Sequence, residues 1–195
     1  MISVRQIPNI LTLLRIALIV PFAIFVYRGA YLEALIVFFV AGLSDGVDGF
    51  LARQFNWKSR FGAIADPLAD KLLLITAYIM LAWTQQLPLW LTVVVLARDL
   101  IIVAGALVYH YLVSRYDIKP SLLGKLCTLV QIVFALALII KLAGFPMPDF
   151  VVEWGVWCVF GVTLVSGLHY VLSWGAQGWQ QLQADTHRHG SDHDD

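Results

Sequence analysis

The chain has few charged residues: Asp, Glu, Lys and Arg make up 13% of its 195 residues, whereas soluble domains carry about 25%. Hydrophobic residues account for 60%. Because so little polar surface is available to face water, this composition predicts an integral membrane protein. The formal net charge is zero and the basic residues form no stripe, which excludes nucleic acid as a partner.

Cysteine is scarce as well, and neither Cys127 nor Cys158 has the spacing of a metal ligand. Both lie in apolar segments, so we expect small buried side chains. No Ser/His/Asp or Cys/His set is apparent, which argues against a covalent protein nucleophile. The first apolar run follows Arg5 without a small-residue cleavage site, so we expect a retained helix and no signal peptide.

Apolar segments long enough to cross a bilayer, which takes about 20 residues, dominate the chain. They cover residues 9–28, 32–53, 62–84, 89–114, 121–143 and 151–175. Most Lys and Arg residues fall on one side when the N-terminus is placed in the cytoplasm, so both termini are predicted to be cytoplasmic. We therefore predict an all-α integral membrane protein: six transmembrane helices in one domain, residues 1–180, and a disordered polar tail, residues 181–195.

Four aspartates interrupt this apolar pattern. Asp45 and Asp48 lie near the end of the second predicted helix, and Asp66 and Asp70 near the start of the third. Side chains three or four residues apart share a helix face, and a short cytoplasmic turn makes the two helices antiparallel neighbours. The four carboxylates are therefore expected to converge at one level near the cytoplasmic surface.

Carboxylates so placed repel one another and lose hydration unless cations neutralise them. Oxygen ligands of this kind prefer hard divalent ions, Mg²⁺ or Mn²⁺ above all, and two such ions suit a reaction on phosphate. The structural alternative is that each aspartate pairs with a nearby base. Glycines near the aspartates, Gly49 and Gly62, indicate close approach of a ligand, with tight helix packing as the alternative. Arg53 either contacts a phosphate oxygen or reaches to the membrane surface.

The two segments resemble the signature motif of the CDP-alcohol phosphotransferases. All eight fixed positions match at the family's spacing: Asp45, Asp48, Gly49, Ala52, Arg53, Gly62, Asp66 and Asp70. The resemblance implies a membrane enzyme, usually a homodimer, that moves a phosphatidyl group from CDP-diacylglycerol to an alcohol and releases CMP. It also implies that Asp45, Asp48 and Asp66 bind metal and that Asp70 completes the site or acts as the base. The CDP moiety would be framed by Gly49, Ala52, Arg53 and Gly62.

The acceptor alcohol is predicted from further resemblances. Segments 7–16, 66–71, 97–99 and 119–131 resemble the two glycerolipid branches of the family, whose acceptors are glycerol 3-phosphate and phosphatidylglycerol. The absence of Trp between Asp45 and Asp48, an Arg-Asp pair at 98–99, and Leu-His-Tyr at 168–170 favour the phosphatidylglycerol branch. We therefore predict phosphatidylglycerol, with glycerol 3-phosphate as the alternative.

The charge of each acceptor bears on the same choice. Glycerol 3-phosphate carries a phosphomonoester of nearly two negative charges, which needs several cations. Phosphatidylglycerol carries one charge and two apolar tails. The candidates for an acceptor pocket are Arg98, Arg115, Lys119 and Lys125, and Cys127 occupies a place where the glycerol-phosphate branch often has a further Lys.

Other polar residues within the predicted helices have two interpretations each. Arg98 and Asp99 are adjacent and do not face each other, so each should pair with another helix, Asp99 with Lys71 or Lys125. Three polar residues near the N-terminus are expected either to contact a nucleotide or headgroup or to cap and anchor the first helix: Asn9, Thr12 and Arg15. His169 is expected to be a buried core histidine.

Two rival functions come from other classes. A cation transporter also carries carboxylates within the membrane, but its site usually lies at the midplane between repeated halves, and no repeat is visible here. A structural scaffold would not depend on its aspartates for any lipid product. The short chain favours the bacterial inner membrane as its location.

Overall fold

A computed structural model of the chain describes residues 7–54, 60–112 and 122–190, with side chains described over 12–44, 68–105 and 122–170. The secondary structure of these parts is entirely α-helical. The helices are α1 (Ile7–Tyr27), α2 (Tyr31–Gln54), α3 (Arg60–Trp83), α4 (Leu89–Leu112), α5 (Leu122–Leu142) and α6 (Asp149–Gly190). The all-α prediction and its six segments are confirmed, because all predicted boundaries but the last lie within about two residues of observed ones, the usual uncertainty of a helix end.

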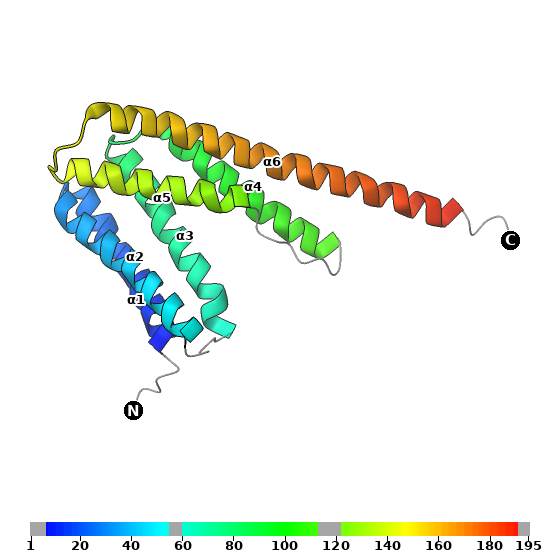
Figure 1. Ribbon diagram of the computed structural model, residues 1–195, viewed down its shortest axis with the longest axis horizontal. Coiled ribbons are helices and arrows are strands. Elements are labelled where there is room, and N and C mark those ends of the chain that lie inside the picture. The colour runs from blue at the N-terminus through cyan, green and yellow to red at the C-terminus, as the bar shows by residue number, and fades with distance from the viewer. Residues whose placement is uncertain (1–6, 55–59, 113–121, 191–195) are drawn as a thin grey trace.

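The exception is the end of α6, which continues to Gly190 where we expected a disordered tail from residue 181. Residues 179–189 contain neither glycine nor proline and include several good helix formers, so a helix can continue there. With 42 residues, α6 is about 63 Å long. Figure 1 shows its orange and red end projecting beyond the other helices.

The helices form two arms, which meet near the turns that follow α1, α3 and α5 and diverge away from these turns (Figure 1). The first arm contains α1, α2 and α3, and the second contains α4, α5 and α6. Contacts of α5 with α2 and α3, and of α4 with α3, join the arms. Within the first arm α1 packs extensively against both α2 and α3, which touch each other only slightly. α2 and α3 are therefore neighbours, as predicted, although each packs more extensively against α1.

The buried core lies where the arms join. It includes Phe22 and Phe38, whose ring centroids are 5.6 Å apart, and the fully buried Leu81 and Leu91. Large hydrophobic side chains are also exposed on the outward faces of the helices, for example Leu100 at 69% and Trp157 at 62%. Soluble monomers rarely expose contiguous apolar surface on this scale, so the helix faces have the character expected next to lipid.

Two helices are long and apolar enough to cross a bilayer by length and composition: Leu122–Leu142, with a mean hydropathy of 2.3, and Asp149–Tyr170, with 1.7. This result covers the described side chains, which include only part of α1 to α4. Shorter apolar stretches there are Thr12–Tyr27 and Tyr31–Ser44.

Packing between α5 and α6 depends on Gly155. A Cβ atom at this position would lie 2.5 Å from the Phe134 ring, too close for any side chain. We expect Gly155→Val to destabilise the protein by about 1–3 kcal/mol through overpacking, measured as a lower midpoint of thermal unfolding in detergent. In the matched control, Gly161→Ala, the new methyl meets nothing within 4 Å and should be neutral or stabilising. Equal effects of the two changes would contradict this account.

Candidate functional site

The predicted motif spans the end of α2 and the start of α3. Asp45, Asp48, Gly49, Ala52 and Arg53 lie in the last turns of α2, and Gly62, Asp66 and Asp70 in the first turns of α3. The helical backbone keeps each aspartate pair on one helix face. Only residues 55–59 separate the two helix ends in the chain, and both ends appear at the lower end of the first arm in Figure 1.

Of the four aspartates, Asp70 is the one whose side chain is described. The side chains of Asp45, Asp48 and Asp66 lie outside the described residues, as do those of Gly49, Ala52, Arg53 and Gly62. Within the described side chains no group of three or more His, Cys, Asp or Glu is present. Convergence of the four carboxylates therefore stays a prediction.

Asp70 is held by Arg15 of α1. The Arg15 Nη1 atom donates to the Asp70 Oδ1 atom at 2.7 Å. The Arg15 side chain is fully buried, whereas that of Asp70 is 44% exposed. Neither interpretation of Arg15, surface anchor or headgroup contact, describes this interaction. No local sequence pattern indicates this pair, because 55 residues separate the partners and only the packing of α1 on α3 brings them together.

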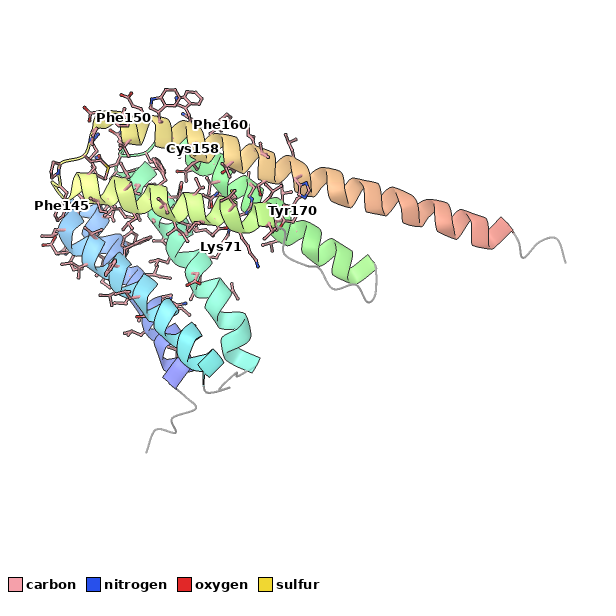
Figure 2. All side chains as sticks on the ribbon, viewed as in Figure 1. Lys71, Phe145, Phe150, Cys158, Phe160 and Tyr170 are labelled. Carbon is pink, nitrogen blue, oxygen red and sulfur yellow. The ribbon has the colours of Figure 1, made fainter. Side chains whose placement is uncertain are left out.

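The next residue, Lys71, starts a second ionic network, which joins three helices. Its Nζ atom lies 2.6 Å from Asp99 Oδ1 on α4, and Figure 2 shows the Lys71 side chain extending from α3. The same Asp99 oxygen accepts a hydrogen bond from Arg98 Nη1 at 3.0 Å. Arg98 Nη2 donates to Ser166 Oγ on α6 at 2.6 Å. The network therefore ties the motif helix α3 to both α4 and α6.

This network confirms one expectation and corrects another. Asp99 pairs with Lys71, as predicted. Arg98 and Asp99 were not expected to interact, because adjacent side chains point in different directions on a helix. They do interact, since the long Arg98 side chain can fold back to its neighbour while its other nitrogen reaches Ser166.

A pocket of about 430 Å³ lies between the cytoplasmic-side ends predicted for α4, α5 and α6; we call it the basic pocket. Its lining consists of Arg98, Ile102, Gly124, Lys125, Thr128, Leu129, Ile132 and Tyr170. The Arg98 guanidinium lies 5.9 Å from the centre of the Tyr170 ring, which is a cation–π distance. Of the four predicted acceptor residues, the pocket brings together Arg98 and Lys125, while Arg115 and Lys119 lie outside the described residues.

A larger hollow of about 950 Å³ surrounds the turn between α3 and α4. Its described lining includes Trp83, Gln86 and Thr92 but no charged residue. A phosphate is better matched by charge-assisted donors, so the smaller basic pocket is the better candidate for an anionic group.

The cysteines and His169 differ partly from expectation. Cys127 is buried, as predicted, and its Sγ atom lies 3.7 Å from Thr163 Oγ1 and 3.4 Å from Gln131 Nε2. Cys158 is exposed on α6, so the prediction of burial is wrong for it (Figure 2). His169 is exposed too, because it lies on the outer face of α6 next to Tyr170, which lines the pocket. Periodicity alone could not tell which apolar face turns outward in a protein whose surface is also apolar.

Comparison with known proteins identifies the family. The family model for CDP-alcohol phosphatidyltransferase matches residues 5–166, most of the chain. The chain belongs to this family. It is therefore a transferase of phospholipid synthesis, and the resemblance of its aspartate motif is confirmed at the level of the family.

Relatives of this CDP-alcohol phosphatidyltransferase carry two different names. CDP-diacylglycerol–glycerol-3-phosphate 3-phosphatidyltransferase of Bacillus subtilis is 32% identical over 198 residues, covering 91% of this chain and 97% of the relative. Cardiolipin synthase (CMP-forming) of Rattus norvegicus is 30% identical over 195 residues, covering 91% and 64%. Cardiolipin synthase (CMP-forming) of Streptomyces coelicolor is 37% identical over 134 residues, covering 64% and 60%. The relatives thus include both predicted branches and do not choose between them.

Proposed function

We propose that this transferase moves a phosphatidyl group from CDP-diacylglycerol to phosphatidylglycerol and releases CMP. The observation that carries the choice of acceptor is the charge of the basic pocket. Arg98 and Lys125 are its described cations, and Asp99, whose Oδ1 atom contacts both Arg98 at 3.0 Å and Lys71 at 2.6 Å, offsets part of the positive charge. A pocket whose main cation is partly compensated in this way suits a phosphodiester with one negative charge better than a phosphomonoester with nearly two.

Glycerol 3-phosphate is the second candidate acceptor. The relative from Bacillus subtilis, which this chain covers almost entirely, carries that acceptor in its name. Arg115 and Lys119, if they face the pocket, would add the charge that a phosphomonoester needs.

Six transmembrane helices with both termini in the cytoplasm form part of the proposal. Support comes from the exposed apolar faces and from α5 and α6, which meet the length and hydropathy of a membrane span. A bacterial inner membrane as the location and a homodimer as the assembly are also part of the proposal. The polar extension of α6 after Tyr170 would leave the membrane on the cytoplasmic side.

The metal site proposed for the motif has the right donor chemistry. Asp45, Asp48, Asp66 and Asp70 offer only carboxylate oxygens on two neighbouring helix ends, which fits hard divalent ions such as Mg²⁺ or Mn²⁺, two in number by our prediction. Such ions, when bound, would supply positive charge that offsets the negative charge of the pyrophosphate. Gly49, Ala52, Arg53 and Gly62 would frame the CDP moiety.

Asp70 is the proposed base. Its carboxylate would accept the proton of the acceptor hydroxyl, whose oxygen then attacks the phosphorus atom joined to diacylglycerol while CMP leaves. Arg15 orients this carboxylate through the 2.7 Å ion pair and leaves it 44% exposed, so that it remains accessible from the site. No covalent bond to the protein is required.

The experiment is an assay of the purified protein with CDP-diacylglycerol and Mg²⁺ or Mn²⁺. Phosphatidylglycerol and glycerol 3-phosphate are supplied in separate reactions, and CMP and the lipid products are identified by mass spectrometry. We expect cardiolipin and CMP. Phosphatidylglycerophosphate as the main product would reverse the choice of acceptor. Absence of CMP with either acceptor and either metal would overturn the proposal and point to another alcohol acceptor first and to the transporter second.

A further inference from the structure

The network of Lys71, Asp99 and Arg98 lies directly behind the basic pocket. Arg98 belongs to both, since its guanidinium lines the pocket while its Nη1 atom donates to Asp99. Asp99 is almost fully buried, with 5% of its side chain exposed, and it does not line the pocket. Any effect of Asp99 on a ligand therefore acts through Arg98 or through its charge.

The charges of the network are close enough to act as one group. One Asp99 oxygen lies 2.6 Å from Lys71 Nζ and 3.0 Å from Arg98 Nη1. Two cations and one anion leave the network with a single positive charge. Its low exposure, 7% for Arg98 and 29% for Lys71, limits screening by water, so removing one charge changes the field in the pocket strongly.

Two contacts fix the direction of the Arg98 guanidinium. Ser166 Oγ accepts from Nη2 at 2.6 Å and Asp99 accepts from Nη1, while the Tyr170 ring lies on the pocket side at 5.9 Å. An arginine held at two nitrogens loses less freedom when it binds a phosphate. Asp99 thus has two consequences for the pocket. It orients the Arg98 guanidinium, and it lowers the net charge of the network behind the pocket from two to one.

From this geometry we infer that Asp99, bridged to Lys71, is the positioning residue that sets the charge preference of the acceptor pocket, favouring an acceptor phosphate with one negative charge over one with two. The inference rests on the proposed function, since it concerns the acceptor of that reaction. It assigns specificity to a residue that does not touch the acceptor.

The test measures one ratio in wild-type protein and variants: kcat/KM for glycerol 3-phosphate divided by kcat/KM for phosphatidylglycerol. Asp99→Asn removes the anion and keeps the shape, so the ratio should rise in favour of glycerol 3-phosphate by roughly tenfold or more. Lys71→Met should lower the ratio by a similar factor. The double variant, Lys71→Met with Asp99→Asn, restores one net positive charge and should return the ratio to within about threefold of wild type.

Two controls separate specificity from folding. Asp99→Glu keeps the charge and should keep the ratio. Asp149→Asn makes the same chemical change at an exposed carboxylate paired with Lys141 and should leave the ratio unchanged. If Asp99→Asn does not fold, Lys71→Met and the double variant still test the predicted order of ratios.

The outcomes distinguish this inference from the proposed function. Wild-type protein that releases no CMP with either acceptor overturns both. If wild-type protein releases CMP but the variants lose activity equally for both acceptors, the inference alone is overturned, because a purely structural role of Asp99 predicts that result. A ratio that follows the net charge through all three variants supports it.

Discussion

Replacing Asp48 with Asn is expected to abolish CMP release while the helices stay folded. The change preserves size but removes a carboxylate from the predicted cluster near the end of α2. Loss of a charged group that organises the site should reduce kcat/KM by about a hundredfold to a thousandfold or more. The folded protein should not become less stable in the absence of metal, because one of four mutually repelling charges is gone.

Two measurements check this prediction. CMP release from CDP-diacylglycerol gives the activity, and thermal unfolding with and without Mn²⁺ reports metal binding without turnover. Wild-type protein should be stabilised by Mn²⁺ and the variant much less. Asp149→Asn is the matched control, since Asp149 lies at the start of α6 and pairs with Lys141. Full activity of Asp48→Asn would remove the metal-site hypothesis.

Asp70→Asn is expected to reduce both activity and stability, unlike Asp48→Asn. The reason is Arg15, whose fully buried guanidinium donates to Asp70 at 2.7 Å. Removing the anion takes a compensating charge away from a buried cation, a change that typically costs about 3–5 kcal/mol when a buried pair is broken. Partial exposure of Asp70 places the expected loss at the lower end, about 3 kcal/mol.

A double variant separates the two roles of Asp70. Arg15→Met combined with Asp70→Asn removes both charges, so stability should recover relative to Asp70→Asn while activity stays lost. Arg15→Met alone should lower kcat while changing KM much less, because the base loses its orientation. Arg15→Lys should restore part of the rate. Thermal unfolding and steady-state kinetics supply the readouts. Recovery of activity in the double variant would show that Asp70 is not the base.

The burial of single residues does not follow from sequence pattern when the outer surface of a protein is also apolar. Cys158 and His169 were expected to be buried, yet both are exposed, because a helix next to lipid presents apolar residues on its outer face as well as its inner one. The usual contrast between an apolar inside and a polar outside is missing. The continuation of α6 to Gly190 was missed for another reason, since its polar composition suits both a solvated tail and a helix outside the membrane.

Local sequence patterns are sufficient to place the helices and to recognise the family motif. Apolar length and helix breakers located the segments, and the spacing of four aspartates, three glycine and alanine positions and one arginine specified the motif, because helical periodicity is a local property. The tertiary structure is needed to pair Arg15 with Asp70 across α1 and α3, and to bring Lys71, one of the two partners predicted for Asp99, to that carboxylate together with Arg98. These pairings depend on which helices are neighbours and on how far long side chains reach, and neither is encoded in the local spacing of residues.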